Sequence, residues 1–244
     1  MGPPLTGTMY ELVSLSTPQA ANGDSMSHTK PSRRDREPPK RSQDPDGTRR
    51  DILDTASKEF ALNGLSGARI DEIAARTKSS KRMIYYYFGD KEGLYVRALE
   101  NAYRTVRDGE NQLDTDGLSP RDALRRLVEF TFDHHREHEE FIRMVMIENI
   151  HHGQYLEKSD VISGLNVTAI DHIASIYRRG VEEGVFRPGL DPLELHWQVS
   201  ALCFFNVSNR ATFSKIFGRD IGASEEQQKL RENAVEMVLR FVAA

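Results

Sequence analysis

The chain of 244 residues contains a single cysteine, Cys203. One cysteine excludes a disulfide within the chain and any zinc site built from several cysteines. Cys203 lies in the apolar run Ala201-Leu202-Cys203-Phe204-Phe205, which favours burial in a core over redox sensing. The sequence also lacks a Gly-rich phosphate-binding loop and a nucleophile elbow, so it gives little support to an enzyme.

Long apolar runs are absent as well, and none approaches the ~20 residues that a membrane-spanning helix requires. Residues 1–27 lack the charged start followed by an apolar block that is typical of a signal peptide. We therefore expect a cytoplasmic protein. A composition that is 38% hydrophobic, with a formal net charge of −4, fits one or two folded domains.

The charge is distributed unevenly along the chain. Residues 1–91 carry 15 Lys and Arg against 12 Asp and Glu, a charge of +3. Residues 92–244 carry 18 against 25, a charge of −7. A basic first part suits contact with phosphates, and an acidic second part would stay away from DNA.

Residues 1–46 are rich in Pro, Ser, Thr, Gly and charge and poor in apolar residues, which predicts a disordered N-terminal arm. The arm contains a basic cluster made of Lys30, Arg33, Arg34, Arg36, Lys40 and Arg41. Such a cluster follows the minor groove or the phosphates of DNA in some proteins, and in others it only keeps the chain in solution. Both interpretations stay open.

Three consecutive tyrosines stand among basic residues in the segment 81–91, Lys-Arg-Met-Ile-Tyr-Tyr-Tyr-Phe-Gly-Asp-Lys. On a helix, Ile84 and Phe88 share one face at i, i+4 spacing, and the opposite side carries Arg82, Met83 and Tyr86. Lys81, Tyr85 and Tyr87 lie on the flanks, where they can reach phosphate oxygens. The pattern is typical of a recognition helix in the major groove of DNA.

Two helices are predicted before this one. Ile52, Leu53, Ala56 and Phe60 form an apolar stripe that ends near Gly64, and residues 69–76 form a second short helix. The polar turn 77–80 separates the second helix from the third, and either Ser79 or Ser80 can cap the helix that follows. Residues 47–91 are therefore predicted to form a helix-turn-helix DNA-binding domain.

These residues resemble the tetracycline-repressor (TetR) family of bacterial transcription regulators, through Phe60…Gly64…Ile70-x-x-Ile73-Ala74 and Tyr85-x-Tyr87-Phe88-x-x-Lys91-x-x-Leu94. The resemblance covers residues 48 to 95. It implies that Lys81, Arg82, Met83 and Tyr86 approach bases, and that Tyr85, Tyr87 and Lys91 touch the backbone. In two departures, Lys78 replaces the usual turn Gly and Arg69 replaces a capping Ser or Thr, and either cation would suit a phosphate contact. The full set of expected DNA contacts is Arg69, Lys78, Ser80, Lys81, Arg82, Met83, Tyr85, Tyr86, Tyr87 and Lys91.

The rest of the chain, residues 92–244, keeps a helical period, so an all-α fold is predicted. Helices are expected over 91–110, from Ser119-Pro120, over 141–150, over 158–184 and from Asp191-Pro192. The apolar helix 141–150 is predicted to lie in the middle of the bundle. The final helix is expected to begin with Ser224-Glu225-Glu226-Gln227, which reads as a capping box.

The last two predicted helices carry more apolar residues than a surface helix needs, among them Trp197, Phe205, Met237 and Phe241. They could pair with their symmetry mates in a four-helix interface, or they could pack only within the chain. The resemblance favours a homodimer, which would place two recognition helices about 34 Å apart on a palindromic operator.

A sensing site is the least defined feature of the sequence. The histidines of this region are His134, His135, His138, His151 and His152, and His134 and His138 have the i, i+4 spacing of metal ligands. Charged neighbours such as Arg136, Glu137 and Glu140 favour a solvated histidine cluster, so no metal or other cofactor is predicted. Glu148 interrupts an apolar helix, where it either caps a neighbouring helix or meets a ligand. Periodicity suggests a pocket for a small effector lined by Phe130, His134, Met144, Ile147, Glu148, Tyr177, Trp197 and Phe204.

The sequence therefore predicts a ligand-responsive transcriptional regulator, a repressor that binds operator DNA as a homodimer and is released by a small-molecule effector. Two alternatives come from other classes. One is a constitutive or architectural DNA-binding protein without an effector, and the other is an enzyme that uses the His and Glu cluster. The large apolar second part argues against the first, and the absence of catalytic motifs argues against the second.

Overall fold

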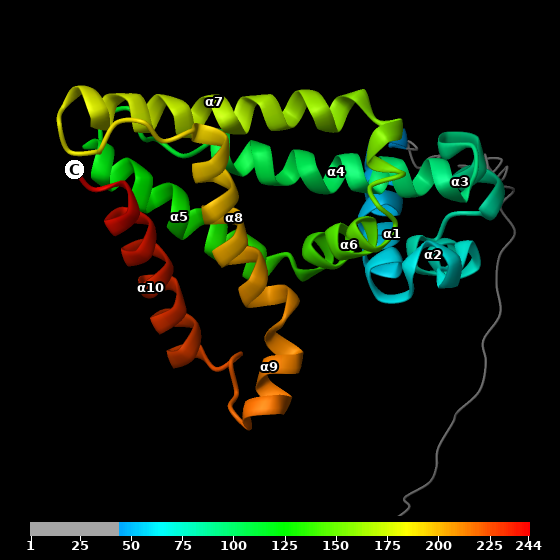
Figure 1. Ribbon diagram of the computed structural model, residues 1–244. Helices are drawn as coiled ribbons and strands as arrows, with labels where there is room; N and C mark the ends of the chain where they lie inside the picture. The colour runs from blue at the N-terminus through cyan, green and yellow to red at the C-terminus, as the bar shows by residue number, and fades with distance from the viewer. Residues whose placement is uncertain (1–43) are drawn as a thin grey trace, which may run out of the picture. The chain divides into compact units, whose positions relative to one another are not determined.

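The computed structural model describes residues 44–244, which form ten α-helices and one 3₁₀ helix (Figure 1). Their bounds are α1 Pro45–Gly67, α2 Ile70–Thr77, α3 Lys81–Phe88, α4 Lys91–Asn111, α5 Pro120–Glu137, α6 Glu139–Ile150, η1 Leu156–Lys158, α7 Asp160–Glu182, α8 Pro192–Ser208, α9 Arg210–Phe217 and α10 Ser224–Val242. Within these residues the only β pairing is an isolated bridge between Phe186 and Ala243. The predicted all-α fold is confirmed. None of these helices is long and apolar enough to cross a membrane.

The predicted N-terminal arm lies almost wholly outside the described residues. Its last two residues, 45 and 46, already belong to α1, because Pro45 occupies the first helical turn and the Asp44 carboxylate accepts the Gly47 N–H at 2.9 Å. The helix therefore begins slightly earlier than predicted.

The first three helices share one apolar core. Ile52, Ala56 and Phe60 of α1 are fully buried, as the predicted stripe requires, and they pack with Ile73 of α2 and Ile84 of α3. This core continues into α4 through Leu94, Tyr95, Ala98 and Leu99. Gly64 has a φ of 64°, which breaks the helical path of α1 where the sequence indicated an end.

The largest core cluster lies among α5, α7, α8 and α10. Leu124 and Val128 of α5 are fully buried there with Ile173 of α7 and Cys203 of α8. Burial raises the pKa of the Cys203 thiol to about 12, so the thiol stays protonated and packs as an apolar group, as predicted. In Figure 1, α4 and α7 run side by side, and they are in contact.

The position of helix α6 differs from the prediction, which placed it in the middle of the bundle. It contributes no residue to the largest cluster and instead contacts α1, with further contacts to α8, α4 and α5. Met144 is fully buried against the α1–α4 core, whereas Ile150 at the end of α6 is exposed. Its apolar composition thus serves a contact between the DNA-binding part and the rest of the chain.

The start of α10 also differs from its prediction. Ser224 is the first residue of the helix, and no side chain caps it, so the expected capping box does not form. Gln227 instead turns inward, where its amide and that of Asn206 on α8 exchange hydrogen bonds of 2.9 and 3.0 Å. Helix α9, between α8 and α10, was not predicted at all.

An aromatic side chain anchors the connection between α7 and α8. Phe186 is buried against α7 beside Tyr177, and the adjacent backbone bonds the C-terminus through Arg187 N–H and the Val242 carbonyl at 2.8 Å. A Cβ at Gly180 on α7 would lie only 1.9 Å from an atom of the Phe186 ring. Glycine at position 180 is therefore required for this close approach.

We expect Gly180→Ala to lower the free energy of unfolding by about 1–3 kcal/mol, because the new methyl group forces the Phe186 ring out of its site. Gly164→Ala is a matched control in the same helix, where a Cβ meets nothing within 4 Å. The control is expected to stabilise the protein by roughly 0.5–1 kcal/mol. Urea unfolding measures both changes, and equal effects would contradict this account of Gly180.

Candidate nucleic-acid interface

Helix α3 presents a polar, aromatic face to solvent and buries the opposite one. Ile84 and Phe88 are buried in the core, as predicted, and Arg82 and Tyr86 are exposed. Tyr86 is 81% exposed, which is unusual for a large aromatic side chain without a partner surface. Met83 and Tyr87 are half-buried, and the Tyr87 ring packs on the core while contacting the Tyr86 and Phe88 rings.

The turn between α2 and α3 has the geometry of a helix-turn-helix. Lys78 ends α2 in the left-handed conformation, with φ 53° and ψ 24°, where a glycine would be less strained. Ser80 caps α3, since its hydroxyl accepts the Met83 N–H at 3.1 Å. Of the two candidate caps, Ser80 makes this bond and Ser79 does not, so the Ser80 side chain has a structural partner.

A buried carboxylate in α1 supports the start of α2. Arg69 stands at the N-cap position without a side-chain cap, and its backbone N–H donates to Glu59 Oε1 at 3.2 Å. The other Glu59 oxygen lies 3.5 Å from the Arg76 guanidinium. Glu59 therefore fixes the backbone at position 69, while no side chain caps the first turn of α2. The Arg69 side chain remains exposed, 3.6 Å from the Glu72 carboxylate.

Two of the predicted phosphate contacts have partners within the protein. Lys81 lies 2.5 Å from the Asp71 carboxylate on α2, and Lys91 donates to the Ser66 carbonyl at the end of α1 at 3.1 Å. Both contacts are exposed, so DNA phosphates can compete for the two ammonium groups.

Arg49 of α1 is a further candidate for contact with DNA. Its guanidinium stands 5.8 Å from the centre of the Phe88 ring and is exposed beside α3. The pair Arg49-Arg50 at the start of the predicted domain is the signal that could have found it. The basic cluster predicted at residues 30–41 lies outside the described residues.

The eight residues of the predicted effector pocket do not line one cavity. Phe130 and His134 on α5 are in contact, with ring centres 5.5 Å apart. Met144 and Ile147 pack against the α1–α4 core, and Phe204 packs on another cluster, with Val106, Phe141 and Ile142. Tyr177 belongs to the largest core, and its hydroxyl bonds the Arg187 carbonyl and the Leu190 N–H. Trp197 is 72% exposed.

The predicted solvated histidine cluster is partly wrong. His134 and His135 are buried, whereas His151 and His152 are exposed. The buried pair follows the apolar stripe of α5, which outweighs the charged residues around it. Among residues 44–244, no group of three metal-ligating side chains comes together.

Glu148, the last member of the predicted pocket, is buried and fully bonded. Its Oε1 accepts the Tyr95 hydroxyl at 2.9 Å, and its Oε2 accepts the backbone N–H groups of Tyr155 and Leu156 at 3.2 Å each. Burial and the neighbouring carboxylate raise the pKa of Tyr95, so its phenol remains the donor. Glu148 was expected either to cap a neighbouring helix or to contact a ligand. In the structure it caps the start of η1.

Tyr95 connects this carboxylate to the DNA-binding part. Its ring meets the Phe60 ring of α1 edge-on at 5.0 Å and the Tyr155 ring at 5.2 Å. Farther along α4, Glu100 accepts the Ser159 hydroxyl at 2.7 Å, at the start of α7. Helix α4 is therefore bonded on one side to the recognition domain and on the other to the segment between α6 and α7.

The fold is helical, and α2, the turn and α3 present exposed basic and aromatic side chains. These features define a helix-turn-helix DNA-binding protein. Residues 52–98 match the family described as "Bacterial regulatory proteins, tetR family", and residues 120–238 match "Tetracyclin repressor-like, C-terminal domain". The chain belongs to the TetR family of transcriptional regulators.

Named relatives are similar over different lengths. The transcriptional repressor NicS of Pseudomonas putida is 37% identical over 181 residues, which cover 74% of this chain and 85% of NicS. The repressor SCO4008 of Streptomyces coelicolor is 32% identical over 112 residues, 46% of this chain and 55% of that protein.

Among solved structures, the transcriptional regulator SCO4942 of Streptomyces coelicolor superposes with a TM-score of 0.62 at 24% identity, over 80% of this chain and 98% of that one. This likeness concerns the fold. Neither the architectural nor the enzymatic alternative gains support from these relatives.

We expect Glu148→Ala to lower the free energy of unfolding by roughly 3 kcal/mol or more, because the Tyr95 hydroxyl and two backbone N–H groups lose their acceptor. Tyr95→Phe removes one of these three bonds and should cost about 1 kcal/mol. The exposed neighbour Asn149 provides a control, since Asn149→Ala should change stability by less than about 0.5 kcal/mol. A Glu148→Ala protein as stable as this control in urea unfolding would contradict the role assigned to Glu148.

Proposed function

We propose that this regulator is a cytoplasmic repressor that binds a palindromic operator as a homodimer and is released by a small-molecule effector. The observation that carries the proposal is the exposed face of α3, where Arg82 and Tyr86 project from a helix anchored by buried Ile84 and Phe88. Repression rather than activation is supported by two relatives that are named repressors.

The predicted DNA contacts fall into two groups in this proposal. Arg82, Met83 and Tyr86 contact base edges, and they set the sequence preference. Arg69, Lys78, Lys81, Tyr85, Tyr87 and Lys91 contact the backbone, and with Arg49 they supply affinity that depends on salt. Ser80 holds the start of α3 in place through its bond to the Met83 N–H.

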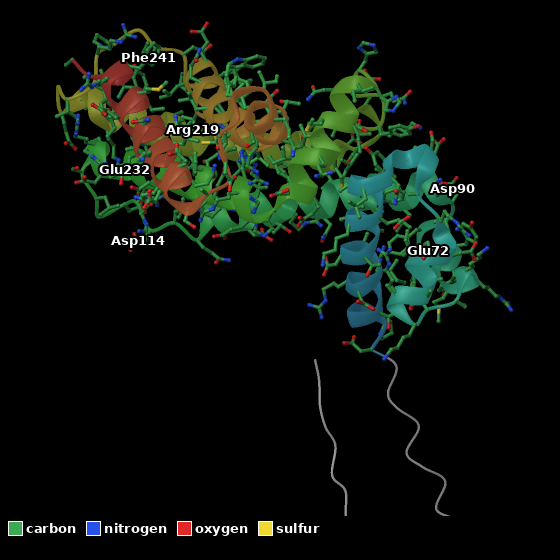
Figure 2. All side chains as sticks on the ribbon, turned by 90° about the horizontal axis from the view of Figure 1, so that it is seen from below. Glu72, Asp90, Asp114, Arg219, Glu232 and Phe241 are labelled. Atoms are coloured by element: carbon green, nitrogen blue, oxygen red, sulfur yellow. The ribbon has the colours of Figure 1, made fainter. Side chains whose placement is uncertain are left out.

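Dimerisation is supported by the exposed apolar residues on α8, α9 and α10. Trp197 and Phe205 of α8 are 72% and 50% exposed, and Met237 and Phe241 of α10 are 51% and 43% exposed. Figure 2 shows Phe241 and Glu232 on α10. A cavity of about 440 Å³ opens among these three helices, and its lining includes Phe205, Phe213 and Met237. A second copy covering this apolar surface would remove it from water.

In this proposal, helix α4 couples effector binding to DNA binding. It begins directly after α3, and its Tyr95 and Glu100 bond to the segment that leads from α6 into α7. An effector that displaces these helices would move α4 and change the separation of the two recognition helices in the dimer. Simultaneous contact with both half-sites would then be lost.

The operator test begins with DNA selected from a random pool on the immobilised full-length protein. We expect a palindromic consensus, with a steep loss of affinity as salt rises. Arg82→Ala and Tyr86→Ala should each weaken binding by about 1–3 kcal/mol and relax the preference at particular bases, whereas Lys91→Ala should weaken binding to all sequences alike.

The matched control for these variants is Arg178→Ala, an exposed cation on α7. Fluorescence anisotropy gives the affinities, and thermal melting checks that each variant is folded. If the Arg82 and Tyr86 variants bind the selected DNA as tightly as the control does, the recognition-helix assignment is wrong.

The dimer test introduces a charge on the exposed apolar face. Trp197→Glu should convert a dimer of two 27.7 kDa chains into a monomer, because the carboxylate would be desolvated at the interface. Val167→Glu on α7 provides a control, since Val167 is 62% exposed but lies on another helix. Sedimentation measures the mass, and a Trp197→Glu protein that stays dimeric would place the interface elsewhere.

A further inference from the structure

The exposed face of α3 carries different chemistry at its centre and at its edges. Ile84 and Phe88 anchor the helix in the core, and Tyr86 stands opposite them at helical spacing. Arg82 lies one turn before Tyr86, and Met83 lies beside them on the same side. With a rise of about 1.5 Å per residue, Arg82 and Tyr86 are about 6 Å apart along the axis, or roughly two base-pair steps of a duplex. In a major groove, the three side chains therefore face neighbouring base pairs.

Arg82 differs from two neighbouring cations in having no carboxylate partner. Lys81 lies 2.5 Å from the Asp71 carboxylate of α2, and Arg69 likewise has a carboxylate partner on α2. Within residues 44–244, Arg82 forms no ion pair, and its side chain is exposed. The guanidinium N–H groups of Arg82 are therefore available to an acceptor outside the protein.

A guanidinium carries donors and no acceptor, which restricts the base that it can read. Guanine presents two adjacent acceptors, N7 and O6, on its edge in the major groove. Adenine presents an acceptor beside a donor, and thymine presents a single acceptor. The planar fork of an arginine matches two adjacent acceptors. Guanine is therefore the base with which Arg82 can form two parallel hydrogen bonds.

Aromatic contacts fix the position of the Tyr86 ring. The Tyr86 and Tyr87 rings meet edge-on with their centres 5.4 Å apart, and the Tyr87 ring meets the buried Phe88 ring at 6.1 Å. Tyr87 itself packs on the core of the domain. Tyr86 is 81% exposed, yet two further rings connect it to this core. Little conformational entropy is therefore lost when a partner covers the Tyr86 ring.

The centre of the exposed face is also apolar. Met83 lies next to Tyr86 on this face, and its backbone is fixed because its N–H donates to the Ser80 hydroxyl at 3.1 Å. Among the four bases, thymine presents a methyl group in the major groove. A tyrosine ring and a methionine side chain gain most from covering such a group, because both surfaces leave water together.

We propose that each half-site of the operator contains a guanine read by Arg82 and, within about two base pairs of it, a thymine whose methyl group packs against Tyr86 and Met83. This inference rests on the proposed function, since it names the bases that the recognition helix reads. Lys81 and Tyr85, on the flank of α3, contact phosphates and do not distinguish bases. One pair of hydrogen bonds and one methyl contact then determine the preference of each half-site.

The first experiment removes single groups from the selected operator. In one half-site, each thymidine is replaced in turn by deoxyuridine, which lacks the methyl group, and each guanine by 7-deazaguanine, which lacks the N7 acceptor. Fluorescence anisotropy on the full-length protein should show one thymine where the loss weakens binding about fourfold and one guanine where it weakens binding about tenfold.

Two results of this scan would overturn the proposal. The first is a selected operator without a thymine within about two base pairs of the sensitive guanine. The second is an operator whose affinity does not change with either substitution at any position.

Protein variants then assign these groups to side chains, at low salt, where weakened variants still bind measurably. Tyr86→Ala should bind the deoxyuridine and thymidine operators equally, and Arg82→Ala should not distinguish 7-deazaguanine from guanine. Tyr86→Phe should keep the parental affinity within about twofold, because the ring makes the contact. If Tyr86→Ala stays as sensitive to deoxyuridine as the parent, the methyl group acts through the shape of the DNA and the assignment is wrong. A loss in Tyr86→Phe as large as in Tyr86→Ala would refute it as well.

Tyr85→Ala and Lys81→Ala are matched controls on the flank of the same helix. Each should weaken binding to all sequences, with the parental sensitivity to deoxyuridine and to 7-deazaguanine retained. Thermal melting checks that every variant is folded. Selective binding of a palindromic operator without these base-specific couplings refutes this inference alone. Absence of selective binding by the parent refutes the proposed function, and this inference with it.

Discussion

The bond between Tyr95 and Glu148 is the contact on which the two parts of the described chain depend. It is buried, it joins α4 to α6, and the same carboxylate fixes the backbone that leads into α7. Because Tyr95 also packs edge-on against Phe60, the DNA-binding core and helix α6 both contact this one tyrosine. If α4 moved away from α6, the buried Glu148 carboxylate would lose the Tyr95 hydroxyl as a donor. This cost favours one arrangement of α4 and α6.

Local patterns were sufficient to predict the recognition domain. The spacing of Ile84 and Phe88, the capping serine and the glycine at position 64 each act within a few residues, and each is found in the structure. Helix-turn-helix geometry is determined over such short distances, which makes it readable from sequence. By contrast, the backbone N–H of Arg69 is bonded by Glu59, ten residues earlier on another helix, and no local sequence pattern indicates this bond.

The predicted effector pocket could not be located correctly from the sequence, because residues that line one cavity meet only through tertiary packing. The charges around His134 suggested an exposed helix end, whereas this side chain is buried. The stripe Leu124, Leu127, Val128, Thr131 and His135 continues at helical spacing, so the burial of His135 could have been predicted from period alone. The cavity beside His134 could not, since the rest of its lining comes from three further helices.

The amide pair of Asn206 and Gln227 has a consequence for assembly. These two side chains are buried and bond each other reciprocally, and apolar residues in their place would pack α8 on α10 with less dependence on alignment. A buried amide pair keeps its partners only in one register, as a single polar residue does in a coiled coil. Sliding one helix along the other by a turn would strand both amides. The pair therefore fixes the alignment of α8 on α10, and with it the arrangement of the exposed apolar residues that the two helices carry.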